Sequence, residues 1–149
     1  MKSKEIIRKE RILEYLDNIK KQLEDIRSIQ VPSKDFFLEK TNTIQTKAIK
    51  YSLACAIQDV TRICVHIVSA LSLWKTRESE SEAILALSDA GILPKEFAEK
   101  IKGMPGFRNR IIHDYFPNEF DAMRLFENIQ GLDDFRKFSK YILDWLEEK

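Results

Sequence analysis

The chain has 149 residues, a length that fits one domain with a single sizeable core, so we predict one domain over residues 1–149. Apolar residues make up 44% of the sequence and charged residues 33%, which excludes a disordered or fibrous protein. The 25 lysines and arginines nearly balance the 24 aspartates and glutamates. An anionic partner must therefore be met by a local basic patch rather than by the field of the whole molecule.

The N-terminal segment MKSKEIIRKERILEYLDNIKK carries charges throughout. It lacks the apolar core of a signal peptide, and no run in the chain approaches transmembrane length. We therefore expect a cytoplasmic protein that does not contact a membrane. Cys55 and Cys64 lie on opposite sides of one helical pattern, roughly 180° apart, and are predicted to be buried free thiols.

The few glycines and prolines fall where helical patterns break, and no strand pattern is visible, so the chain is predicted to be all-α. The first helix is expected from about Glu5 to Ile29. Its core stripe recurs every three or four residues and consists of Ile12, Leu16, Ile19, Leu23 and Ile26. The residues Val31-Pro32-Ser33 end this helix, because a residue before proline avoids the α region.

The longest helix is expected from about Asp35 to Trp74. Its predicted core stripe consists of Ile49, Leu53, Ile57, Val60, Cys64, Ile67, Leu71 and Trp74. The second half of this helix holds more alanine, isoleucine and valine than one stripe needs, so a second face is expected to be covered by another helix or by a second subunit. We favour a dimer on this basis.

Local signals mark the next helices. The spacing of Ser79 and Glu82 fits a capping box for a helix through Asp89, which Gly91 should end. Pro94 suits the first turn of a short helix.

The residues Met104-Pro105-Gly106 predict a turn in which Gly106 adopts a positive φ. A helix should then begin at about Phe107 and end by Tyr115, because Pro117 disfavours a helical residue before it. Ile111 and Ile112 are expected to point into the core.

The last two helices are expected over roughly Glu119 to Gln130 and Leu132 to Glu147, hinged at Gly131. The core side of the last one is predicted to hold Leu132, Phe135, Phe138, Ile142 and Trp145. The whole pattern predicts a bundle of about five or six helices.

The stretch GFRNRIIHDY, residues 106–115, gathers polar residues that suit chemistry. On one helix, Asn109 and Arg110 lie four and three residues before His113, so these three side chains should form a cluster. Arg108 lies five residues before His113, roughly 140° around a straight helix. These two side chains would converge only if Arg108 left the first turn or curled around it.

Histidine and arginine together suit the cleavage of a phosphodiester. Histidine transfers protons near neutral pH, and arginine is a permanent forked donor for phosphate oxygens. In RNA the adjacent 2′-hydroxyl supplies the nucleophile, so no metal ion is required, and no metal-binding motif is visible in the sequence. A capping arginine and a histidine near a helix end would show the same spacing without catalysis.

The residues Arg108, Asn109 and His113 resemble the signature of the HEPN superfamily. With Tyr115 added, the pattern R-x-x-x-x-H-x-Y is similar to that of the HepT toxins of HEPN/MNT toxin–antitoxin pairs. Further likeness runs from about Ala48 to Leu143, through AIQDVTRICVHIVSALSLW, SEAILALSDAGILP and GLDDFRKFSKYI. Residues before and after this range resemble the family less distinctively.

This resemblance implies an all-α HEPN bundle that forms a homodimer, with both motif copies facing a shared cleft where RNA is cut without a metal ion or a cofactor. It also implies a partner. In these type VII pairs, a nucleotidyltransferase antitoxin transfers AMP from ATP to the motif tyrosine, which here is Tyr115. The attached AMP would place negative charge beside the motif and repel RNA phosphate.

The resemblance also suggests a role for each motif residue. His113 is the general base towards the 2′-hydroxyl or the acid towards the leaving oxygen, and Arg108 stabilises the phosphorane. Asn109 orients His113 or contacts phosphate. Two roles stay open for Arg110, namely contact with the RNA backbone or an ion pair with Asp114.

Residues outside the motif are given structural roles. His66 stands among apolar residues, which is typical of a packed, hydrogen-bonded core or interface histidine, although it could line the dimer cleft. Gln58, Asp59 and Arg62 share one helix surface, as in a solvated or interface network.

A second hypothesis is a non-catalytic helical module that binds a nucleotide or a partner and uses Arg108 only to grip phosphate. A purely structural subunit ranks last, because it explains neither Asn109 beside His113 nor Tyr115.

Overall fold

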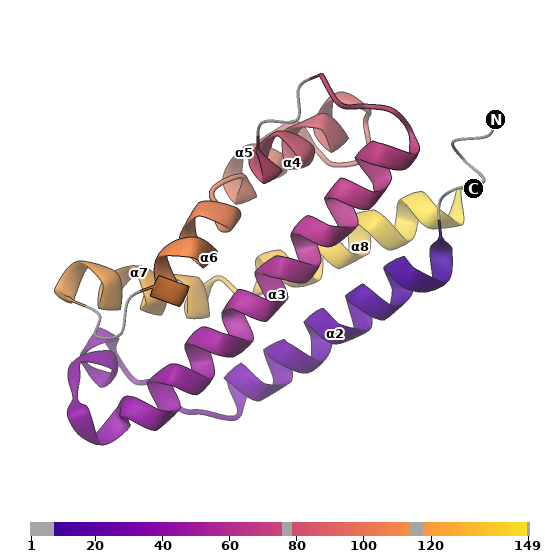
Figure 1. Ribbon diagram of the computed structural model, residues 1–149. Helices are drawn as coiled ribbons and strands as arrows, with labels where there is room; N and C mark the ends of the chain where they lie inside the picture. Colours follow the sequence, from indigo (N-terminus) through magenta and orange to yellow (C-terminus); the bar gives the residue numbers. More distant parts are fainter. Residues whose placement is uncertain (1–7, 76–78, 114–117, 149) are drawn as a thin grey trace.

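The computed structural model describes residues 8–75, 79–113 and 118–148. In these ranges the chain is helical and has no strand, which confirms the all-α prediction (Figure 1). The elements are α2 (Lys9–Arg27), two short 3-10 turns η1 (Lys34–Leu38) and η2 (Lys40–Asn42), α3 (Thr43–Ala70), α4 (Glu80–Asp89), α5 (Lys95–Ile101), α6 (Met104–His113), α7 (Glu119–Gln130) and α8 (Asp133–Glu147). The prediction of one domain over residues 1–149 stays a prediction.

Helix α3 is the central element of the bundle, with α2 beside it along its length and α8 behind it (Figure 1). The predicted stripe of α2 is confirmed, since the residues that α2 buries are Ile12, Leu16, Ile19, Leu23 and Ile26. Of the stripe predicted for the longest helix, the residues from Ile49 to Ile67 are buried, whereas Leu71 and Trp74 lie beyond α3 and are half-buried. Each helix buries one apolar stripe, and these stripes pack together into one core.

The second apolar face of α3 is covered by helices of the same chain. Residues such as Ala56, Ile63 and Val68 are fully buried, and α3 packs against α4 and α6 as well as against α2. The helical run Lys40–Ala70 is, unexpectedly, long and apolar enough to cross a membrane by length and composition alone, but 67% of its apolar window is buried inside the protein. That burial is typical of a core helix, which can have the length and apolar composition of a membrane-spanning helix.

The predicted start of the longest helix at Asp35 was wrong. Lys34–Leu38 forms a 3-10 turn that packs against α7 and buries Phe37. Glu39 then has an extended backbone, with φ −87° and ψ 129°, so the helical hydrogen bonds cannot continue through it. The α-helix begins only at Thr43 and ends at Ala70, before Ser72 with its φ of 55°.

The start and stop signals of α4 are confirmed. The Ser79 hydroxyl accepts a hydrogen bond from the Glu82 backbone N–H at 3.2 Å, which caps α4. Gly91 follows the end of α4 with a φ of 78°, a conformation that glycine adopts without strain. Pro94, predicted in the first turn of the short helix, is instead the residue before α5 and has an extended backbone, with ψ 143°.

The predicted turn at Met104-Pro105-Gly106 was wrong, because these residues form the first turn of α6. The Phe107 N–H donates to the Gly103 carbonyl at 3.0 Å, a helical hydrogen bond. Proline fits a first turn because its missing N–H would have no partner within the helix. Arg108 therefore lies in the second turn of a regular helix.

The C-terminal helices follow the prediction, with Gly131 between α7 and α8. The Asn118 side chain caps α7 by accepting from the Asp121 N–H at 2.8 Å. The predicted core side of the last helix is buried throughout and consists of Leu132, Phe135, Phe138, Ile142 and Trp145. Cys55 and Cys64 are both free thiols, Cys64 fully buried and Cys55 half-buried.

Candidate functional site

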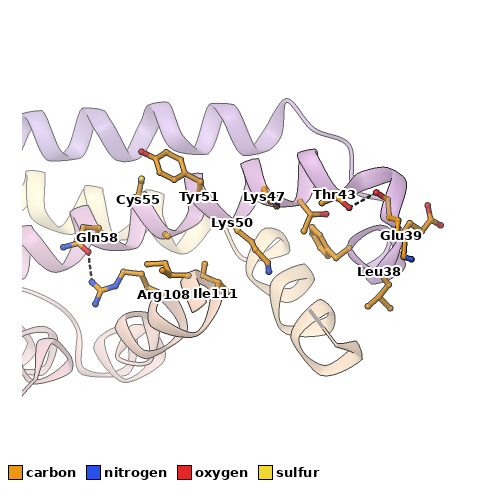
Figure 2. Close-up of a pocket in the computed structure, with 15 residues that line it drawn as sticks. Leu38, Glu39, Thr43, Lys47, Lys50, Tyr51, Cys55, Gln58, Arg108 and Ile111 are labelled. Carbon is orange, nitrogen blue, oxygen red and sulfur yellow. Dashed lines mark hydrogen bonds between the residues drawn. The ribbon is translucent and has the colours of Figure 1, made fainter. Parts of the chain in front are cut away.

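Arg108 is buried at the junction of α6, α4 and α3, with only 8% of its surface exposed. Its terminal nitrogens donate to both carboxylate oxygens of Glu80, at 2.6 and 3.2 Å. One of them also donates to the Gln58 side-chain oxygen at 2.9 Å (Figure 2). The Asn109 side-chain oxygen accepts two further hydrogen bonds, at 3.0 and 3.3 Å.

These five hydrogen bonds match the five N–H donors that a guanidinium group has. Arg108 therefore has no spare donor in this conformation. Before it could grip a phosphate oxygen, it would have to exchange at least one of these acceptors for the ligand.

Glu80 reaches Arg108 from the first turn of α4, directly after the Ser79 cap. The hydrogen bond from Arg108 lowers the pKa of the Glu80 carboxyl, with further lowering from the positive charge of Arg108 and from the Thr61 hydroxyl, against a rise from burial. The pair is therefore ionised at neutral pH, and its forked geometry is the strong form of an arginine–carboxylate contact.

His113 is exposed at the last described position of α6. Because Arg108 stays on the same helix, five residues away, the two side chains leave the helix roughly 140° apart. No hydrogen bond joins His113 to Arg108 or to Asn109 in the described part of the chain. Arg108 stays within the regular helix α6, so Arg108 and His113 of one chain do not converge. Asn109 contacts Arg108 rather than His113.

Arg110 lies on the side of α6 that faces away from Arg108, and its side chain reaches α7. Its Nε donates to Asp121 Oδ1 at 2.6 Å, and its guanidinium lies 5.9 Å from the centre of the Phe120 ring. Asp114, the predicted partner of Arg110, and Tyr115, the predicted site of AMP attachment, lie outside the described residues.

The prediction that Ile111 and Ile112 both point into the core is half right. Ile111 is buried, whereas Ile112 is 58% exposed. Consecutive residues of a helix point about 100° apart, so both could be buried only if the core enclosed α6 widely. Ile112 instead lines an open groove.

This groove lies between the η turns, α3 and α6, and it has a volume of about 610 Å³. Arg108 and Gln58 stand at one end of it and Leu38 and Glu39 at the other (Figure 2). The residues that line it include Lys40, Lys47, Lys50, Tyr51 and Cys55. The groove thus connects the buried motif arginine to the surface of α3.

His66 is hydrogen-bonded, as predicted, since its Nε2 accepts at 3.1 Å from the backbone N–H of Arg8, the residue before α2. Burial lowers the pKa of His66, with smaller contributions from the charges of Arg11 and Arg8. The network predicted around residue 59 is present in part, since buried Asp59 pairs with Arg62 at 3.3 Å while Gln58 turns to Arg108.

Sequence reasoning missed Glu80 and the groove lysines. Glu80 follows the predicted cap, but no local spacing connects it to Arg108, 28 residues further on. Among the described residues, no group of three or more histidine, cysteine, aspartate or glutamate side chains lies close enough to hold a metal ion.

Solved structures similar to this chain include toxin–antitoxin complexes. One is the tri-AMPylated HEPN toxin of Shewanella oneidensis in complex with its MNT antitoxin, with a TM-score of 0.76 and 21% sequence identity, covering 93% of this chain and 99% of that one. Another is a toxin–antitoxin complex with AMP-PNP, with a TM-score of 0.74 and 20% identity, covering 91% and 98%. The fold is therefore that of the HEPN toxins.

The family model for HepT-like ribonucleases matches residues 19–142, which include Arg108, Asn109 and His113. The chain belongs to the HepT-like ribonuclease family. No curated protein sequence is significantly similar to it.

Proposed function

We propose that this protein is the toxin of a type VII HEPN/MNT toxin–antitoxin pair and that it cuts RNA endonucleolytically without a metal ion. The observation that carries the proposal is the motif of Arg108, Asn109 and His113 within the residues that match the HepT-like ribonuclease family. His113 transfers the proton of the 2′-hydroxyl or of the leaving oxygen. Arg108 stabilises the charge of the phosphorane, and Asn109 holds Arg108 or contacts phosphate.

The active form in this proposal is a homodimer in the cytoplasm. Within one chain, exposed His113 and buried Arg108 point away from each other. A second copy that brings its own motif to the same cleft would supply the group that one chain cannot present. This geometry supports the dimer.

The proposed partner is an MNT nucleotidyltransferase, as in the Shewanella complex with its AMPylated toxin. AMP attached to Tyr115 would add negative charge two residues after His113 and would repel RNA phosphate. Modification therefore neutralises the toxin without unfolding it.

The first test is the intact mass of the protein before and after incubation with ATP and its nucleotidyltransferase, followed by RNA cleavage with both forms in the presence of EDTA. We expect a gain of AMP units on Tyr115, lost in the Tyr115→Phe variant, and silenced cleavage. His113→Ala should abolish cleavage at an unchanged melting temperature. A His113→Ala protein that cuts RNA at the rate of the unchanged protein would refute the assignment.

One observation favours a second candidate, a non-catalytic module that binds a nucleotide or a partner. All five donors of Arg108 are bound to side chains of the protein itself. From the sequence, Arg108 in such a module is expected only to grip phosphate. The bonds seen here instead connect α6 to α3 and α4, a role that needs no catalysis. A protein that binds its nucleotidyltransferase, shows no cleavage and tolerates His113→Ala would support this candidate.

A further inference from the structure

One face of the first half of α3, which holds both exposed and buried residues, is the floor of the groove that leads to Arg108. The floor residues recur every three or four positions along α3 and are Thr43, Thr46, Lys47, Lys50, Tyr51, Ala54, Cys55 and Gln58. Such a stripe from residue 43 to residue 58 is about 22 Å long. The groove is therefore an elongated track along one helix rather than a closed pocket.

The charge of this track is locally positive, although the whole chain carries only +1. Its lining holds Lys40, Lys47, Lys50 and Arg108 against the carboxylate of Glu39, and the charge of Arg108 is balanced by Glu80. Lys40 and Lys47 are exposed and have no ion-pair partner among the described residues. Two lysines without carboxylate partners in a groove, here Lys40 and Lys47, attract a polyanion.

The track also offers flat apolar surface. Tyr51 is 69% exposed and Ile112 is 58% exposed, and both line the groove. Leu38, Ala54 and Ile111 add further apolar contact. An aromatic ring beside a cationic groove is how proteins bind single-stranded nucleic acid, since bases stack on the ring while lysines follow the phosphates.

A buried hydroxyl in the wall is unsatisfied. Among the described residues, Thr46 Oγ1 is buried without a hydrogen-bond partner. A polar group of a ligand that reached it would remove this deficit, whose cost is on the order of 1–3 kcal/mol. Because this atom is buried, a ligand in the groove could reach it only after the side chains around it moved.

We propose that the groove is the track for single-stranded RNA, with Lys40 and Lys47 contacting successive phosphates and Tyr51 stacking on a base, so that the strand is led towards Arg108. This proposal rests on the proposed ribonuclease function and names the surface that its substrate follows. The groove is then the local basic patch through which a chain of near-zero net charge can bind an anionic partner.

The test measures binding apart from cleavage. Fluorescence anisotropy of a short fluorescein-labelled single-stranded RNA is recorded with the His113→Ala protein and with the same protein carrying Lys40→Glu and Lys47→Glu together, or Tyr51→Ala. Lys95→Glu is the matched control, because Lys95 is exposed on α5 and lies outside the groove lining.

We expect the double charge reversal to weaken binding about tenfold or more and to reduce the salt slope by about 0.7 for each lost phosphate contact. Tyr51→Ala should weaken binding without changing that slope, and Lys95→Glu should change neither. Cleavage by the corresponding proteins that retain His113 should fall through KM rather than kcat.

The other results overturn the proposal in distinguishable ways. RNA binding and cleavage that are unaffected by both groove variants would refute the track but leave the ribonuclease function intact. No binding of RNA by any form, together with no cleavage, would refute both. Displacement of the RNA by an equal concentration of AMP would indicate a mononucleotide pocket. A change in the sedimentation mass with unchanged RNA affinity would show that this face binds a second copy of the chain.

Discussion

Arg108 and Glu80 form a forked ion pair that joins α6 to the start of α4, with donor–acceptor distances of 2.6 and 3.2 Å. The Arg108 side chain is only 9% exposed and that of Glu80 36%. The residue expected to touch phosphate is thus also a structural connection between two helices. Its loss would affect both activity and stability, so a variant of Arg108 alone cannot separate the two.

Glu80→Ala should therefore lower the free energy of unfolding by about 2 kcal/mol, because it leaves a nearly buried guanidinium without its charged acceptor. Glu80→Gln, which keeps an accepting oxygen, should cost less. Urea denaturation of the unchanged protein, Glu80→Ala and Glu80→Gln measures these losses in the free energy of unfolding. Asp133→Asn is the matched control, since it removes an exposed pair with Arg136, and such pairs contribute little. Equal losses for Glu80→Ala and Asp133→Asn would contradict this account.

The core of the bundle could be predicted from the sequence because its signal is local. The stripes of α2 and α8 repeat within a few residues, and each stripe needs only the period of one helix to be recognised. The caps at Ser79 and Gly91 are local in the same way. Every residue in these two stripes was assigned correctly for that reason.

The errors came from signals that are ambiguous or that act over long distances. Pro105 fits a turn and the first turn of a helix equally well, and only the packing of α6 decides between them. The 3-10 turn before α3 buries Phe37 and packs against α7, which lies far along the chain. The motif residues were named from their resemblance to a family, but the partner of Arg108 comes from another helix that no local pattern identifies.

Arg110 has two open roles, and Asp121 allows them to be separated. The two side chains pair at 2.6 Å, and Asp121 is largely buried beside the Asn118 cap of α7. If Arg110 contacts the RNA backbone, Arg110→Ala should lower kcat/KM for RNA several-fold while Asp121→Asn does not. If the pair is only structural, both variants should lower the melting temperature alike and leave kcat/KM unchanged. Thermal melts and cleavage kinetics of both variants decide this point.

The two cysteines should differ sharply in reactivity. Burial raises the pKa of the Cys64 thiol far above its usual range, so little of the reactive thiolate forms. Cys55 is half-buried in the groove wall. In the native protein an alkylating reagent should modify Cys55 alone, and Cys64 only after denaturation. Intact mass with peptide mapping measures this, with Cys55→Ser as the control that should stay unmodified. Rapid native modification of Cys64 would contradict its position in the core.

His66 should make the stability of the fold depend on pH between neutral and mildly acidic conditions. Burial and the charges of Arg11 and Arg8 lower its pKa in the folded state, whereas the unfolded chain keeps the ordinary value of about 6.5. The unfolded state therefore binds the proton more readily, and the free energy of unfolding should fall as the pH drops below about 6.5 towards the lowered folded pKa. Protonation would also remove the lone pair with which Nε2 accepts from the Arg8 N–H.

Urea denaturation at a series of pH values between about 5 and 8 measures this loss. The His66→Gln variant, whose side-chain oxygen can still accept a hydrogen bond, should be stable to a similar degree at the upper end of this range and should lose less stability at the lower end. The Glu80–Arg108 pair does not confound the result, because the pKa of Glu80 is lowered from an ordinary value of 4.5 and the pair stays ionised throughout the range. A variant whose stability falls as steeply with pH as that of the unchanged protein would show that other groups govern the dependence.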